Sequence, residues 1–180
     1  MKHNIYKFGL VILLLTLNAC TKQIENQNYS AVNLSNSDAC YVDAMILMQH
    51  PGPKAQMLRK NDERIFFCDT KEFFIELLAP EVAGQTLASF VQDAGGRAWG
   101  SYSDAWIEAK KAYYVFDSNQ LGAMGPTIVP FSQIDAANAF IQKHHGEVKK
   151  YSEITIETIE AYIKKTANRF REAPHMEHMH

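Results

Sequence analysis

The segment RIFFCDTKEFFIELLAP, residues 64–80, contains a strand signal followed at once by a helix signal. Residues 64–68 form a short apolar run bounded by polar turn residues, which is typical of a strand. Asp69 or Thr70 can cap a helix, because a short polar side chain accepts a hydrogen bond from the first free backbone N–H groups. Apolar residues then recur at helical spacing, and Pro80 ends the pattern. The segment therefore predicts a strand joined directly to a helix.

The residues on either side extend this pair of elements into a larger unit. Residues 54–58 alternate between apolar and polar character and precede a turn at Asn61 and Asp62, so they predict an earlier strand. Residues 87–91 predict a further strand after the helix. The expected order of this first unit, residues 39–95, is β-β-α-β.

The same order recurs in the second half of the chain. Residues 112–117 and 127–131 are strand candidates, with a turn at Gly122 between them. Ser132 can cap a helix that ends near Gly146, and a closing strand follows. We therefore expect an α+β fold with two tandem β-β-α-β units.

The remaining part of the predicted domain is a connector and a final helix. The second unit is assigned to residues 96–152 and begins with a connector that holds both tryptophans, Trp99 and Trp106. Apolar residues at helical spacing predict an amphipathic helix over residues 153–170. A tail follows at residues 171–180.

The N-terminus has the features of a secretory signal. Basic residues precede a short apolar run, and Leu-Asn-Ala-Cys ends it at Cys20, which resembles a bacterial lipobox. We expect residues 1–20 to be a signal peptide and Cys20 to carry lipid, with a buried N-terminal helix as the alternative. Residues 21–38 are polar and are predicted to be a flexible tether. Thr21 stands where the lipoprotein pattern would place a retention residue, which favours the outer membrane over the inner one.

Composition narrows the classes of function. The net charge is −2 and basic residues form no stripe, so nucleic acid is not expected as a partner. The sequence has no HExxH, paired CxxC, phosphate-loop or Gly-x-Ser-x-Gly motif, and we do not expect an enzyme. With Cys20 assigned to lipid, a disulfide between Cys40 and Cys68 would be ordinary in an oxidising compartment.

A second interpretation of the remaining sulfur atoms is a metal site. Thiolate and thioether ligands select Cu(I). Cys40, at the end of the tether, is expected to be accessible, and Met124 lies in a turn where its sulfur is easily exposed. Cys68 is either a ligand or a small buried apolar residue, and His50 either binds metal or orients the turn that follows it.

The C-terminal tail offers further neutral ligands. Its candidate metal-binding residues are His175, Met176, His178, Met179 and His180. Imidazole and thioether groups accept copper in either oxidation state. The alternative is a frayed end or a tag remnant without a function.

Several segments together resemble the NosL family of nitrous oxide reductase accessory lipoproteins. They are Cys40 with Met45, the run His50-Pro51-Gly52-Pro53-Lys54-Ala55-Gln56, the helix start Phe67-Cys68-Asp69-Thr70, Trp106 to Ala109 ahead of Ala112-Tyr113-Tyr114-Val115, and Gly122-Ala123-Met124-Gly125-Pro126-Thr127. The segments occur in the family's order over residues 40–153. The resemblance implies two β-β-α-β units like those of alkylmercury lyase.

The resemblance also implies a function. NosL proteins are membrane-anchored periplasmic copper-binding proteins that supply Cu(I) for the copper–sulfur centre of nitrous oxide reductase. Cys40, Met45 and Met124 match sulfur-bearing family positions, and Cys68 matches a cysteine of some members. Many members carry Cys-x-x-Cys-Gly-Met, but here Asp43 and Ala44 replace the second cysteine and the glycine.

These observations combine into one expected site. Cys40 and Met124 are expected to hold Cu(I), with Met45 or His50 completing the coordination and Cys68 as a further candidate. Because Cys68 starts a helix in the first unit, we expect it to lie away from Cys40. The expected partners are nitrous oxide reductase and its ABC-type maturation machinery, and the copper donor is unspecified. The shared fold with alkylmercury lyase alone does not predict cleavage of organometallic bonds.

Overall fold

The computed structural model describes residues 28–101 and 104–172, with side chains described as far as residue 168. Cys20, the signal peptide and the five tail ligands from His175 to His180 lie outside these residues. The strands are β1 (Ala55–Arg59), β2 (Arg64–Phe67), β3 (Thr86–Gln92), β4 (Trp106–Glu108), β5 (Tyr113–Phe116), β6 (Leu121–Gly122), β7 (Gly125–Pro126), β8 (Val129–Phe131) and β9 (Glu147–Lys150). The helices are α2 (Thr70–Leu78), α3 (Ile134–His144) and α4 (Ile156–Glu172).

The first sheet is antiparallel, with the strand order β2-β1-β3-β4. Ala55 in β1 is paired with Phe67 on one side and with Val91 on the other. As β1 has a neighbour on each side and other elements cover both faces, residues 55–58 are all buried. The strand predicted over residues 54–58 is confirmed as β1, and its polar residue Gln56 is buried together with its apolar neighbours.

The second sheet repeats the arrangement of the first. Its order is β8-β5-β9, so the first strand of the unit again lies between the second and the last, as in β2-β1-β3. Both neighbours of β5 are antiparallel to it. The α+β fold and its C-terminal helix are confirmed, and the unit boundaries drawn at residues 95 and 152 stay predictions.

Helix α2 begins as its sequence indicates. Asp69 is the N-cap, and its side chain accepts a hydrogen bond from the backbone N–H of Lys71. Phe73 and Phe74 are buried, and Phe74 makes an edge-to-face contact with Tyr114 at a centroid distance of 4.9 Å. This contact joins α2 to the second sheet, so the two units share one core.

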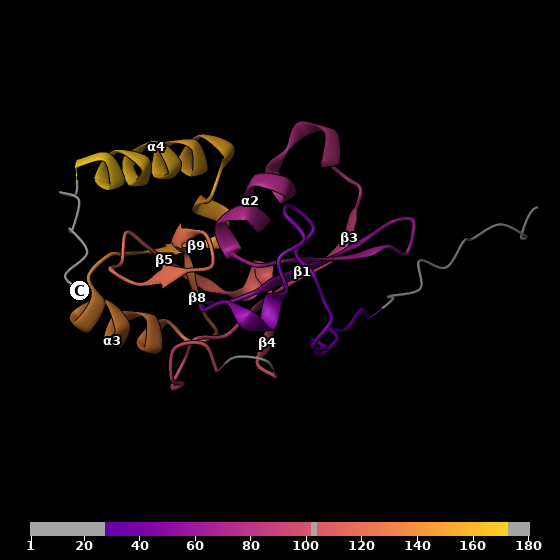
Figure 1. Ribbon diagram of the computed structural model, residues 1–180, viewed down its shortest axis with the longest axis horizontal. Coiled ribbons are helices and arrows are strands. Elements are labelled where there is room, and N and C mark those ends of the chain that lie inside the picture. Colours follow the sequence, from indigo (N-terminus) through magenta and orange to yellow (C-terminus); the bar gives the residue numbers. More distant parts are fainter. Residues whose placement is uncertain (1–27, 102–103, 173–180) are drawn as a thin grey trace, which may run out of the picture.

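Helices cover both faces of the second sheet (Figure 1). Tyr114 and Phe116 point to the side of α2 and α4, where they share a cluster with Ile159 and Tyr162. Val115 points to the opposite side and packs near α3. This alternation is what β5 requires, because successive side chains of a strand point to opposite faces.

The cap expected for α3 is wrong. Gln133, rather than Ser132, is the N-cap, and it makes no side-chain capping hydrogen bond. The Ser132 hydroxyl instead donates to Asp93, which also accepts the Ser132 backbone N–H at 3.1 Å. This contact fastens the start of α3 to the end of β3. Helix α4 begins at Ile156 rather than at residue 153, because residues Tyr151–Glu153 form a 3-10 turn.

Residues 28–38, the described part of the predicted tether, contact the first sheet. The Val32 backbone N–H donates to Gln56 Oε1 at 3.0 Å, and the Gln56 amide donates to the Val32 carbonyl at 2.9 Å. Arg64 donates to the Ser30 carbonyl at 3.1 Å. This part of the chain is therefore attached to the domain. Among the described helices, none has the length and apolar character needed to span a bilayer.

Candidate metal centre

Cys40 and Cys68 lie side by side, although the sequence separates them widely. The Cys68 backbone N–H donates a hydrogen bond to Cys40 Sγ at 3.2 Å. Both are free thiols, and their side chains are 3% and 0% exposed. The expected separation of the two cysteines is wrong, and so is the expected accessibility of Cys40. The alternative of a Cys40–Cys68 disulfide is not what the structure contains.

Backbone pairing explains why the two thiols meet. The Tyr41 backbone N–H donates to the Phe66 carbonyl at 2.8 Å, which attaches the Cys40 segment to β2. Ala39 and Ile46 form an antiparallel bridge, and the Cys40 N–H donates to the Met45 carbonyl at 2.9 Å, so this segment folds back on itself. β2 ends one residue before Cys68, which places that thiol beside the loop.

Asp43 is the third member of the group. One ligand atom from each of Cys40, Asp43 and Cys68 lies within 4.8 Å of the others, and no further group of three such residues occurs in the parts of the chain that the structure describes. Asp43 is exposed, whereas both thiols are buried. One signal in the sequence points to Asp43, since the resemblance to NosL places it at the second cysteine of the Cys-x-x-Cys-Gly-Met motif. Here a carboxylate takes that position and Cys68 provides the second thiol.

The pKa values of the two thiols are shifted in opposite directions. A hydrogen bond from the Cys68 thiol, aided by backbone N–H groups, lowers the pKa of Cys40 below its usual value. The same hydrogen bond, together with burial and the charge of Cys40, raises the pKa of Cys68. One proton is therefore shared, with Cys40 as the thiolate of the pair. A thiolate is the form that binds metal ions.

The loops that carry the predicted thioether ligands lie beside this pair. Met45 and Ala123 pack against the cluster formed by Cys40, Leu47 and Cys68. Met124, next to Ala123 at the tip of the β6–β7 hairpin, is 38% exposed, as expected for a turn. The structure thus brings the Met45 loop and the Met124 hairpin to the two thiols.

His50 is placed differently. It is half-buried at the end of a 3-10 turn, Leu47–Gln49, and its ring does not belong to the Cys40–Asp43–Cys68 group. Its carbonyl accepts a hydrogen bond from the Lys54 ammonium at 3.0 Å. The described contacts of His50 are therefore those of a turn residue.

Two buried charged residues adjoin the centre. Lys54 donates to the carbonyl groups of His50, Pro51 and Gly52. Burial lowers the pKa of Lys54 below its usual value, and the nearby charges of Asp69 and of the Cys40–Cys68 pair partly offset this effect. Burial raises the pKa of Asp69 above its usual value, and the backbone N–H groups of Lys71 and Met124 partly offset this effect. Sequence patterns did not identify either residue as part of a site.

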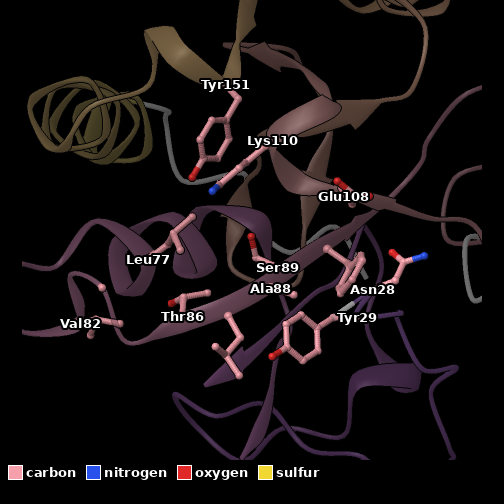
Figure 2. Close-up of a pocket in the computed structure, with 13 residues that line it drawn as sticks. Asn28, Tyr29, Leu77, Val82, Thr86, Ala88, Ser89, Glu108, Lys110 and Tyr151 are labelled. Carbon is pink, nitrogen blue, oxygen red and sulfur yellow. The ribbon is translucent and has the colours of Figure 1, made fainter. Parts of the chain in front are cut away.

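A separate open pocket of about 440 Å³ lies along β3 (Figure 2). Tyr29 and Tyr151 lie on either side of the strand, with Lys110 near Tyr151 and Glu108 further along. No cysteine, methionine or histidine is among the described residues that line it. The described residues that line this pocket include none of Cys40, Asp43 and Cys68.

The fold and the donor set together define a small α+β domain with a sulfur-rich cluster suited to a soft metal ion. The chain belongs to the NosL family, whose model matches residues 31–159. It is 34% identical over 154 residues to the copper-binding lipoprotein NosL of Achromobacter cycloclastes, covering 83% of this chain and 80% of that protein. It is 34% identical over 146 residues to the copper-binding lipoprotein NosL of Stutzerimonas stutzeri, covering 80% of this chain and 76% of that protein.

A solved structure shows the same fold. The crystal structure of the copper chaperone NosL from Shewanella denitrificans has a TM-score of 0.64 and 32% sequence identity to this chain. The match covers 71% of this chain and 97% of that one. Nearly the whole of that protein thus corresponds to the domain described above.

Proposed function

We propose that this protein is a copper chaperone that carries Cu(I) as its cargo. The observation that carries the proposal is the contact between Cys40 and Cys68, with Met45 and Met124 on adjacent loops. Thiolate and thioether sulfur favour Cu(I) over harder cations. The names of the Achromobacter, Stutzerimonas and Shewanella relatives, which describe copper binding or a copper chaperone, support it.

The candidate ligands have different roles in the proposed copper site. Cys40 supplies the first thiolate, because its pKa is lowered. Met124 supplies an exposed thioether, and Cys68, Met45 and His50 are the candidates that complete the site. Because Met124 is partly exposed, an incoming ligand of a partner can reach the copper ion before the chaperone's own ligands leave. Transfer then proceeds by ligand exchange without a free ion.

We also propose a cellular location, a copper destination and a partner for the protein. The lipobox-like sequence at Cys20 and the names of the lipoprotein relatives support a periplasmic protein anchored to a membrane through lipid. The outer membrane is favoured by Thr21. The copper–sulfur centre of nitrous oxide reductase is the proposed destination, with the ABC-type maturation machinery as a partner. The tail residues His175, Met176, His178, Met179 and His180 form a proposed second place of copper capture.

Copper titration tests the assignment. The mature chain without lipid, residues 21–180, contains all the described elements and is titrated with Cu(I) under reducing conditions against a competing chelator. We expect tight binding that Cys40→Ser and Met124→Ala both weaken. Met48→Ala is the matched control, because Met48 is similarly exposed, at 46%, and is not in the proposed ligand set. Wild-type affinity in both site variants would contradict the assignment.

A second measurement separates the proposal from the disulfide alternative. Free thiols are counted on protein isolated without reductant, since binding through Cys40 requires the thiolate. We expect Cys40 and Cys68 to react after unfolding in denaturant. A fully oxidised pair that resists reduction would favour a structural lipoprotein without a metal.

A further inference from the structure

Asp69 is a buried acidic residue that is not among the proposed copper ligands. Its side chain is 0% exposed, and Oδ2 completes no hydrogen bond within the described residues. Capping α2 uses Oδ1 alone, through the Lys71 backbone N–H at 2.9 Å. A serine or threonine would cap the helix about as well without burying a carboxyl group. The capping role therefore does not account for an aspartate here.

The remaining contacts of Asp69 are with the hairpin that carries Met124. Oδ1 accepts a hydrogen bond from the Thr127 hydroxyl at 2.9 Å, just after β7. Oδ2 lies against Gly122 in β6, where an added Cβ atom would be 2.2 Å away. Asp69 thus contacts both sides of the hairpin, before and after Met124.

The neighbouring residues reinforce this attachment. The Lys71 ammonium donates to the Met124 carbonyl at 2.9 Å. On the other side, Gly52 approaches Gly122 so closely that a Cβ atom on Gly52 would lie 2.7 Å from the Gly122 Cα. The hairpin is therefore held between the first turn of α2 and the loop that precedes β1.

Cys68 is the residue immediately before Asp69, and its N–H contacts Cys40 Sγ. The same short segment therefore holds the thiol pair on one side and the Met124 hairpin on the other. We propose that Asp69 is a positioning residue that holds the Met124 thioether at the Cys40–Cys68 pair. This inference rests on the proposed copper function. Asp69 then affects copper affinity through the position of Met124.

Asp69→Asn is the direct test because it keeps the volume but replaces one acceptor oxygen beside the hairpin with an NH2 donor, which cannot accept from the Met124 backbone N–H or the Thr127 hydroxyl. Substitutions of residues that orient metal ligands typically cost 10- to 100-fold in affinity, and we expect a loss of about that size. The measurement is the Cu(I) dissociation constant of the mature chain, by chelator competition. Asp93→Asn is the matched control, because Asp93 also accepts backbone and hydroxyl hydrogen bonds, from Gly95 and Ser132, but between the end of β3 and the start of α3. We expect its copper affinity to equal that of wild type.

A double-mutant cycle separates positioning from a general structural effect. If Asp69 acts through Met124, then Asp69→Asn changes the affinity less than about twofold when Met124→Ala is already present. An equal loss in both backgrounds would overturn the inference. If Asp69→Asn does not fold, Thr127→Val replaces it, since it removes the hydroxyl donor to Oδ1 and otherwise only a long contact of 3.4 Å with the Thr70 hydroxyl. That variant is expected to weaken Cu(I) binding in the wild-type background and not in Met124→Ala.

The outcomes also distinguish this inference from the proposed function. A wild-type chain that does not bind Cu(I) would overturn the proposed function and this inference with it. A wild-type chain that binds, with Met124→Ala weakened and Asp69→Asn unchanged, would overturn the inference alone.

Discussion

The backbone N–H of Cys68 donates a hydrogen bond to Cys40 Sγ at 3.2 Å, across 28 positions of sequence. Because the two thiols are in contact, the protonation state of each one affects the pKa of the other. The donated hydrogen bonds favour a thiolate at Cys40, while the charge of Cys40 opposes a second thiolate at Cys68. Above about pH 7, where Cys40 loses its proton, the metal-free pair therefore carries one negative charge and one proton.

The shared proton predicts a pH effect on copper binding. Because the pKa of Cys68 is raised, binding Cu(I) through both thiolates must displace its proton. We expect about one proton released per Cu(I) at about pH 8, measured by calorimetry in buffers of different ionisation enthalpy. Cys68→Ser should abolish the release.

The sign of the pH dependence follows from the same pair. As the pH falls through the lowered pKa of Cys40, a second proton must be displaced, so the affinity should decrease more steeply below that pKa than above it. An affinity that does not change with pH would show that neither thiol is a ligand.

Asp43→Asn tests the contribution of the carboxylate. Oxygen ligands favour harder cations, so we expect the Cu(I) affinity to change by less than about tenfold. The asparagine Oδ1 can still accept the Met45 backbone N–H that Asp43 accepts at 3.1 Å, which preserves the loop. Chelator competition measures the effect, with Cys40→Ser as the comparison. A loss as large as that of Cys40→Ser would make Asp43 a principal ligand.

The three described helices and strands β1, β2, β3, β5, β8 and β9 were predictable because their signals are local. The Asp69 cap, the helical spacing of Phe73 and Phe74, and the repeated β-β-α-β order depend on neighbouring residues. β4 was missed because three residues after a Gly-rich connector contain too little pattern, and its pairing with β3 is a long-range contact.

The ligand types at the site were predictable, but their arrangement was not. Cys40 and Cys68 meet through pairing of the Tyr41 N–H with the Phe66 carbonyl, which no periodicity reveals. The same is true of Asp69, since its contacts with Gly122 and Thr127 depend on how the second unit packs on the first. Residue types and the family resemblance named the candidate donors, and tertiary packing decides which of them meet.

Gly122→Ala should displace the Met124 hairpin. Its Cβ atom would lie 2.2 Å from Asp69 Oδ2 and 2.9 Å from Thr127 Cβ, so these atoms must move. We expect a loss of about 1–3 kcal/mol in the free energy of unfolding, measured in urea, together with weaker Cu(I) binding. Gly84→Ala is the control, since no atom lies within 4 Å of its added Cβ. That control should lose stability only through its positive φ and should bind copper as wild type does.

Tyr114→Phe separates the stability of the core from copper binding. The Tyr114 hydroxyl is buried and donates to the Ala109 carbonyl at 2.7 Å, so its removal leaves that carbonyl without this donor. We expect a loss of about 1–3 kcal/mol in the free energy of unfolding and no change in Cu(I) affinity. Tyr113→Phe, in the same strand, should cost less, because no hydrogen bond of its hydroxyl occurs in the described part of the chain. Equal losses would show that the Tyr114 hydrogen bond contributes little.

X-ray absorption at the copper edge of the Cu(I)-loaded mature chain tests whether Cys40 and Met124 bind the metal. We expect a coordination shell dominated by sulfur, which loses a sulfur neighbour in Cys40→Ser and another in Met124→Ala. A shell of nitrogen and oxygen atoms, or a sulfur count that is the same in wild type and both variants, would contradict it.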